Sequence, residues 1–231
     1  MKDIHSNLDL KEDAATKALD FVQDHMKIGL GTGSTTAIFI KRLGEKIKKE
    51  NINLLCCTTS YQSFLLAKEY NIRVLPIQFF SELDISVDGA DEVDPQLNLI
   101  KGGGAAHTLE KIVHSMSKNF ICIVDPSKKV KQLGEKFFVP IEVIPEAVEV
   151  VKKQLYQLNA KEVQIRMAQK KDGPVITDKG NLVIDAKFEN FDPMELEKKL
   201  NLIPGVVENG IFSIYKPHIL IVGGEEIQYR S

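Results

Sequence analysis

The sequence contains no tryptophan, few aromatic residues and no large excess of charge of either sign. Its 30 Lys and Arg side chains against 32 Asp and Glu leave a formal net charge of −2, which provides no overall attraction for nucleic acid. An aromatic content of 7% also argues against a surface that stacks single-stranded bases. The composition therefore predicts no nucleic-acid partner.

Cysteine is scarce, and long apolar runs are missing. Cys56, Cys57 and Cys122 are odd in number and two of them are adjacent, which suits neither a disulfide framework nor a zinc site. No apolar run approaches the roughly 18 residues of a membrane span, and the start of the chain lacks the apolar core of a signal peptide. We therefore expect buried, reduced thiols in a cytoplasmic protein that does not bind membranes.

What the sequence does contain is the composition of an ordinary globular protein and a regular alternation of strand and helix patterns. With 231 residues, 43% hydrophobic and 27% charged, the chain is long enough for one large domain or two unequal ones. The first strands are expected at residues 27–30, 54–58, 73–77, 84–87 and 120–124, with amphipathic helices before and between them. This order predicts an α/β fold, with a Rossmann-like, mostly parallel sheet and helices on both faces.

The pattern changes after about residue 130. There the order becomes strand, helix, strand, strand, helix, strand, which is typical of a smaller ferredoxin-like α+β lobe. The final apolar run, residues 218–222, is a strand beyond those of the βαββαβ lobe, and we expect it to rejoin the first sheet. The sequence thus predicts a Rossmann-like catalytic domain from residues 1–130 and 210–231, and a ferredoxin-like βαββαβ lobe from residues 131–209.

The first motif that could bind a ligand is a glycine-rich turn, Gly29-Leu30-Gly31-Thr32-Gly33-Ser34-Thr35-Thr36, between a strand and a helix. Its glycines let the backbone approach a ligand, and the free N–H groups at a helix start attract an anion. A dinucleotide site is disfavoured, because Ser34 stands where its fingerprint needs a third glycine. A single phosphate group on a small molecule fits better, although a plain strand-to-helix turn is an equally good interpretation of this motif alone.

The second motif is the acidic turn Asp88-Gly89-Ala90-Asp91-Glu92-Val93-Asp94, at the end of a predicted strand. Ligands bind at the carboxyl ends of the strands in open α/β sheets. A calcium loop is disfavoured, because Ala90 and Leu99 stand where it needs acidic ligands. An exposed acidic turn is the ordinary alternative, but the apolar residues before it and a further motif soon after it favour a site.

The third motif, Lys101-Gly102-Gly103-Gly104-Ala105-Ala106, again leads into a helix. Successive glycines can direct several N–H groups at one oxygen and so bind developing negative charge, with Lys101 as a nearby cation. Glu110 follows on the helix, where a lone glutamate is usually a solvated surface residue. His107 and His114 flank Glu110 at helical spacing and are expected to be surface or packing residues.

Together these motifs resemble those of the ribose-5-phosphate isomerase family, type A. The resemblance runs nearly end to end and includes residues 120–125, 140–145, 174–181 and 203–207. The chain departs from the family pattern before the glutamate, where His107-Thr108-Leu109 replaces the usual Leu-Thr-Arg. Loss of that arginine puts an ion pair near the glutamate in doubt.

The resemblance implies an aldose–ketose isomerase that interconverts D-ribose 5-phosphate and D-ribulose 5-phosphate through an enediolate, without a metal or organic cofactor. It makes Glu110 the base that moves a proton between C1 and C2, and Lys101 with the glycine amides the groups that stabilise the enediolate oxygen. Asp88 and Asp91 would contact the sugar hydroxyls and assist ring opening. The implied catalytic residues are Glu110, Asp88, Lys101 and Asp91. The implied substrate-binding residues are Thr32, Gly33, Ser34, Thr35, Asp88, Gly89, Ala90, Asp91, Lys101, Gly102, Gly103, Gly104, Lys128 and Lys11.

The resemblance also implies a place in the pentose phosphate pathway and a homodimer, with a tetramer as the other state found in the family. Two alternatives stay open on the residues alone. A sugar-phosphate-sensing domain of related fold would bind without turnover, but it would not need Glu110 and Lys101 together. A related acyl- or CoA-transferring enzyme would need a nucleophilic glutamate and a larger ligand groove.

Overall fold

The computed structural model describes residues 4–230, and the chain divides into two compact units. The first unit comprises the chain up to Ala90, Leu109–Lys128 and Pro217 onward, and the second comprises Asp91–Thr108 and Lys129–Lys216. Residues 91–108, 129–130 and 210–216, which we expected in the first domain, belong to the second unit. The physical reason is strand pairing, because β4 (Glu92–Val93) and β5 (Leu99–Ile100) form a three-stranded sheet with β11 (Ile211–Phe212).

The first unit contains a six-stranded sheet in the order β13-β12-β6-β3-β1-β2. Its strands are β1 (Lys27–Leu30), β2 (Leu55–Thr58), β3 (Leu83–Asp88), β6 (Ser117–Val124), β12 (Ile219–Val222) and β13 (Gln228–Tyr229). All neighbours are parallel except the edge strand β13. The expected mostly parallel sheet is therefore confirmed, as is the return of the C-terminal run, which pairs as β12 with β6.

One expected strand of this sheet does not form. Of residues 73–77, only Val74 makes an isolated bridge to Cys56. Pro76 has no backbone N–H to donate to a strand ladder, and the chain turns there into a short 3-10 helix (Ile77–Phe79). The segment therefore runs along the sheet edge without becoming part of it.

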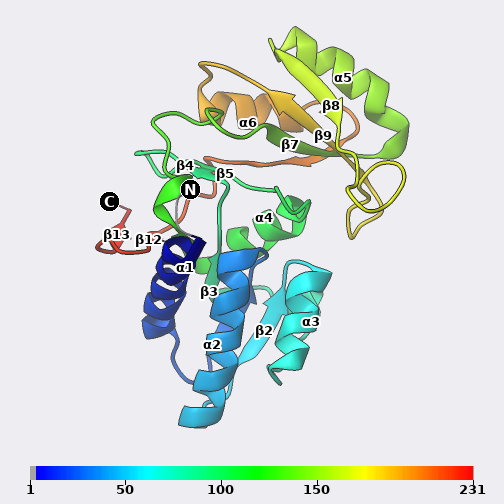
Figure 1. The fold of residues 1–231 in the computed structure, drawn as a ribbon. Coiled ribbons are helices and arrows are strands. Elements are labelled where there is room, and N and C mark those ends of the chain that lie inside the picture. Colours follow the sequence, from blue (N-terminus) through cyan, green and yellow to red (C-terminus); the bar gives the residue numbers. More distant parts are fainter. Residues whose placement is uncertain (1–3, 231) are drawn as a thin grey trace. The chain divides into compact units, whose positions relative to one another are not determined.

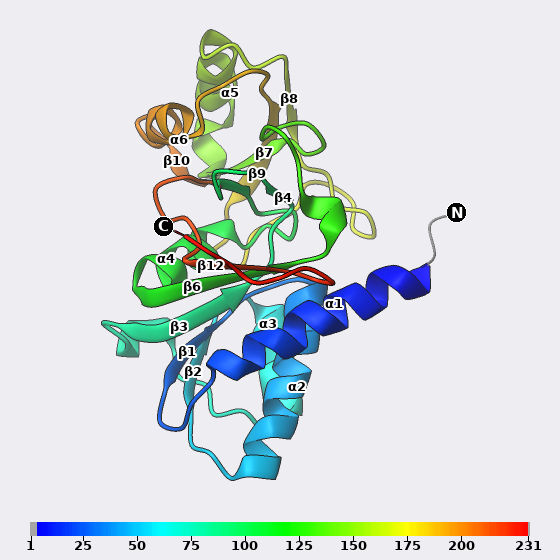
Figure 2. The ribbon, with the colours of Figure 1, turned by 90° about the vertical axis from the view of Figure 1, so that its left-hand side faces the viewer.

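Helices cover both faces of the first sheet. On one face lie α1 (Ile4–Ala18), α2 (Ser34–Glu50) and α3 (Tyr61–Glu69), which share one apolar core with the sheet (Figure 2). On the other face, Val113 of α4 (His107–Ser115) packs with Leu83 and Cys57. Among the helices within residues 4–230, none is both long and apolar enough to cross a membrane.

The second unit contains a four-stranded antiparallel sheet in the order β10-β7-β9-β8 (Figure 1). Its elements are β7 (Val139–Val143), α5 (Val148–Gln157), β8 (Glu162–Ile165), β9 (Leu182–Lys187), α6 (Pro193–Asn201) and β10 (Val206–Asn209). Both helices contribute buried side chains to one core with this sheet. The βαββαβ order and this strand arrangement confirm the expected ferredoxin-like lobe.

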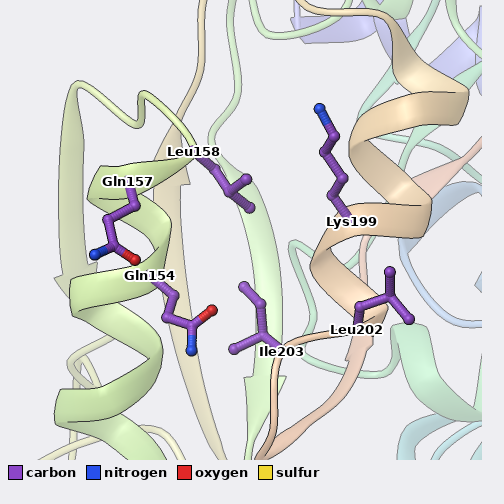
Figure 3. Close-up of a pocket in the computed structure, with 6 residues that line it drawn as sticks. All are labelled: Gln154, Gln157, Leu158, Lys199, Leu202 and Ile203. Atoms are coloured by element: carbon purple, nitrogen blue, oxygen red, sulfur yellow. The ribbon is translucent and has the colours of Figure 1, made fainter.

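A shallow pocket lies between α5 and α6 of the second unit (Figure 3). Its volume is about 230 Å³, and it is lined by Gln154, Gln157, Leu158, Lys199, Leu202 and Ile203. None of these residues belongs to the motifs that predict chemistry, so this pocket is not the site that the sequence indicates.

The three thiols are free and buried, as the sequence predicts. Burial raises the pKa of the Cys57 thiol to about 12, and it raises the pKa of Cys56 well above its usual value, with the adjacent Cys57 adding to the effect. Because the thiolate is the reactive form, such thiols are inert.

We expect a soluble disulfide reagent at about pH 8 to leave all three cysteines of the native protein unmodified. The same reagent should label all three once the protein is unfolded in denaturant, which serves as the positive control. Labelling of the native protein at the rate of a free thiol, followed by absorbance, would contradict the burial of these side chains.

Candidate active site

The glycine-rich turn of the first unit connects the carboxyl end of β1 to the start of α2. Gly33 is the residue before the helix and has a φ of 115°, a conformation that favours glycine. Gly31 lies so close to Asp88 that a Cβ at position 31 would be 2.1 Å from the aspartate Cγ. The first N–H groups of α2 have no carbonyl partner within the helix, so the turn presents donors and the positive end of the helix dipole.

Polar side chains surround this turn. The Lys11 ammonium donates to Ser34 Oγ at 3.1 Å, so the structure brings this predicted cation to the turn. The Gly33 N–H donates to Gln62 Oε1 at 3.2 Å, and the Thr32 hydroxyl bonds to hydroxyls at the end of β2. Lys128 ends a short 3-10 helix (Pro126–Lys128) that follows β6, so it lies beyond the carboxyl edge of the same parallel sheet.

The Asp88 carboxylate ends β3 and is fully buried. Its Oδ1 accepts hydrogen bonds from the Thr32 N–H at 3.0 Å, the Gly89 N–H at 2.7 Å and the Thr36 hydroxyl at 3.4 Å. The aspartate therefore ties the glycine-rich turn to the acidic turn. The hydroxyl of Thr36, the last residue of the glycine-rich motif, is thus directed at this carboxylate.

His114 also belongs to this cluster, although its place in the sequence predicts only a surface or packing residue. Its Nε2 lies 3.1 Å from Asp88 Oδ2, its Nδ1 lies 3.0 Å from Ser86 Oγ, and its ring stacks on Phe120 with 3.7 Å between centroids. Because an ionised carboxylate only accepts, Nε2 is the donor to Asp88. His114 is indeed a packing residue, but it also orients an aspartate. The signal in the sequence was the polar Ser86 within an apolar strand, on the same face as Asp88.

Glu110 lies in the first turn of α4 and is buried, with 4% of its surface exposed. The ordinary expectation for a lone helical glutamate, a solvated side chain, is therefore wrong here. A carboxyl group that a protein buries is a strong indication of chemistry, because burial of a charge is costly unless the surroundings compensate for it.

The glycine run is ordered by contacts within the second unit. Lys101 is buried, its N–H donates to the Gly210 carbonyl at 2.9 Å, and its ammonium lies 5.6 Å from the centre of the Phe212 ring. The Gly103 N–H donates to Asp91 Oδ2 at 2.7 Å. The structure thus brings Asp91, Lys101 and the glycines together in the second unit.

Gly102 is the position in this run that only glycine suits. Its φ is 105°, and a Cβ there would lie 2.7 Å from His107 Nδ1. The Gly102 carbonyl accepts from the Ala105 N–H at 2.9 Å, which closes a turn immediately before α4. The α4 helix begins at His107 and includes Glu110.

The two remaining carboxylates of the acidic turn have structural partners. Glu92 accepts hydrogen bonds from the backbone N–H groups of Gly134, Lys136 and Phe137. Asp94 accepts from Asn98 and stabilises its own turn. Over the described part of the chain, no group of three or more His, Cys, Asp or Glu side chains is arranged to hold a metal ion.

A sequence profile of the family described as "Ribose 5-phosphate isomerase A (phosphoriboisomerase A)" matches residues 55–226. The chain belongs to this family. The ribose-5-phosphate isomerase A of Pyrococcus horikoshii is 52% identical over 220 residues, which cover 94% of this chain and 95% of that protein. The family membership confirms the resemblance that the motifs predict.

Solved structures of the family have the same fold. The ribose 5-phosphate isomerase A of Methanocaldococcus jannaschii aligns with a TM-score of 0.92 at 46% identity, covering 96% of this chain and 99% of that one. A D-ribose-5-phosphate isomerase in complex with phospho-erythronic acid aligns with a TM-score of 0.92 at 51% identity, covering 96% and 97%.

We expect His114→Ala to lower the turnover of ribose 5-phosphate by roughly 10- to 100-fold, because Asp88 loses the group that holds its Oδ2. A coupled spectrophotometric assay measures this effect. His25→Asn is the matched control, because His25 is a largely exposed histidine whose φ of 62° asparagine accepts. Unchanged turnover in His114→Ala would show that the position of Asp88 does not depend on this contact.

Proposed function

We propose that the chain interconverts D-ribose 5-phosphate and D-ribulose 5-phosphate by moving a proton between C1 and C2 through an enediolate. Membership of the family supports the activity. The related structure with phospho-erythronic acid supports the intermediate, because the two oxygens of that ligand's carboxylate share negative charge as the oxygens of an enediolate do. Nothing favours the alternative of a sensing domain without turnover.

The substrate phosphate binds at the glycine-rich turn. The N–H groups of the first turn of α2, together with Thr32, Gly33, Ser34 and Thr35, suit a phosphate in position and charge. Lys11 adds a cation that already contacts Ser34, and Lys128 adds another from beyond the end of β6. Binding of the phosphate supplies binding energy at a distance from the reacting carbons, and it orients those carbons.

Glu110 is the base, and its burial is the observation that carries this assignment. A carboxylate removed from bulk water becomes basic enough to take a proton from the carbon next to a carbonyl. After transfer from one carbon, the same carboxyl returns the proton to the adjacent one. The reaction therefore needs no redox group.

Lys101 and the glycine run Gly102–Gly104 stabilise the negative oxygen of the enediolate, through amides other than that of Gly103, whose N–H donates to Asp91. Asp88 and Asp91 contact the sugar hydroxyls and assist opening of the ring form, and Gly89 and Ala90 line the substrate between them. Asp88 is suited to this role because three hydrogen bonds from the backbone N–H groups and Thr36 fix its position.

The base assignment is tested by Glu110→Gln, which keeps the shape of the side chain and removes its basicity. We expect turnover of D-ribose 5-phosphate to fall by roughly 10²–10⁴, while the affinity for inorganic phosphate stays nearly unchanged. Glu149→Gln is the control, because that side chain is 82% exposed. The assay is run alongside other aldose phosphates, and turnover of Glu110→Gln near that of the unaltered protein would remove Glu110 as the base.

The chemistry that we propose uses no metal ion. We therefore expect dialysis against a chelator to leave the initial rate unchanged within error, with a zinc-dependent enzyme treated in parallel as the control for the chelator. A loss of rate that one divalent ion restores would overturn this part of the proposal.

The chain acts in the cytoplasm, in the non-oxidative branch of the pentose phosphate pathway, as a homodimer or a tetramer. Membership of the family supports this assignment. Sedimentation equilibrium distinguishes the two assemblies from a monomer.

A further inference from the structure

Arg166 is a residue of the second unit that lies outside the three glycine-rich and acidic motifs, and it contacts the glycine run. It directly follows β8. Its Nη1 donates to the Gly102 carbonyl at 2.8 Å and to the Gly103 carbonyl at 3.1 Å. One guanidinium nitrogen thus joins two successive peptide groups of the predicted oxyanion site.

The orientation of Arg166 is fixed by a second, independent set of contacts. Its Nε and Nη2 donate to the two carboxylate oxygens of Asp185 on β9, at 2.8 Å and 2.5 Å. Both side chains are mostly buried, at 17% and 15% exposure. The Arg166 backbone is held on both sides as well, by hydrogen bonds to Val183 and Val175. A planar guanidinium held on one edge presents its remaining nitrogen in one direction.

The geometry of the peptide bond transmits this contact to the opposite side of the run. In a trans peptide, the carbonyl of one residue and the N–H of the next point in opposite directions, and no described peptide bond is cis. Arg166 holds the Gly102 carbonyl, and the Gly103 N–H accordingly points to Asp91. By the same rule, holding the Gly103 carbonyl directs the Gly104 N–H away from Arg166.

We propose that Arg166 is a positioning residue for the isomerisation. It orients the peptide planes of the glycine run so that the Gly104 N–H faces the enediolate oxygen, while the Gly103 N–H is occupied by Asp91. The contact also polarises the Gly103–Gly104 peptide, which strengthens that N–H as a donor. This inference rests on the proposed function, in which the glycine run binds the oxyanion.

Glycines explain why such a residue is needed. Three successive glycines have the largest conformational freedom of any tripeptide, so an unrestrained run would not keep its N–H groups in place. Catalytic stabilisation of charge requires donors that are oriented before the reaction begins. The ion pair with Asp185 alone could be merely structural, joining β8 to β9, and the experiment separates the two roles.

The test compares two ligands of the intact protein. In Arg166→Met, we expect kcat to fall by roughly 10- to 100-fold and the affinity for phospho-erythronic acid, measured by calorimetry, to fall by a similar factor. The affinity for inorganic phosphate should stay within about twofold, because the phosphate turn belongs to the first unit. Arg166→Lys should give an intermediate loss of kcat and of affinity for phospho-erythronic acid, since lysine keeps the charge but lacks the planar guanidinium with its several N–H donors. Lys199→Met is the control that removes a different ion pair of the second unit.

A merely structural role predicts another outcome. It would lower the melting temperature of Arg166→Met and Asp185→Asn alike and leave the ratio of the two ligand affinities unchanged, and this result would overturn the proposal. If Arg166→Met does not fold, Arg166→Lys decides by the same ratio.

Lys101→Met and Glu110→Gln report on the proposed function itself. Full activity in these two would refute the site, whereas their inactivity beside a fully active Arg166→Met would refute only the role of Arg166.

Discussion

The hydrogen bonds of the Asp88 carboxylate hold together the two turns at the edge of the first unit where we expect the ligand to bind. The carboxylate lies buried at the end of β3 and accepts hydrogen bonds from the N–H groups of Thr32 and Gly89, which belong to two different turns. A buried carboxylate must find such donors, because an uncompensated charge in the interior is costly. Its position excludes a side chain at position 31 and explains why a glycine directly follows the neighbouring strand β1.

In the second unit, charged side chains likewise form hydrogen bonds to the backbone of the glycine run. Asp91 accepts the N–H of Gly103, and Arg166 donates to the carbonyls on the other side of the same backbone. In both units, a charged side chain orders a glycine-rich backbone whose exposed N–H groups are then available for an anion. We expect the protein to bind negative charge by these local arrangements, which its net charge of −2 does not reveal.

Much of the fold could be predicted because it depends on local periodicity. Apolar strand patterns between amphipathic helices predict the parallel sheet, and the change of order after residue 130 predicts the βαββαβ lobe. The predictions that are wrong concern segments whose structure depends on pairing partners distant in the sequence. Residues 91–108 belong to the second unit because β5 pairs with β11. Residues 73–77 do not form a strand, because Pro76 has no N–H to donate and only Val74 makes a bridge to the sheet.

The sequence by itself determined the fold class and the family, because each motif is a continuous run whose residue types have few other uses. The residues that carry the chemistry stay a prediction from the same motifs. Only the tertiary structure decided which side chains hold those motifs in place. His114 and Arg166 look like ordinary polar residues in the sequence, yet one contacts Asp88 and the other contacts Gly102 and Gly103. Such contacts join positions far apart in the chain, and burial makes them specific, but no local pattern records them.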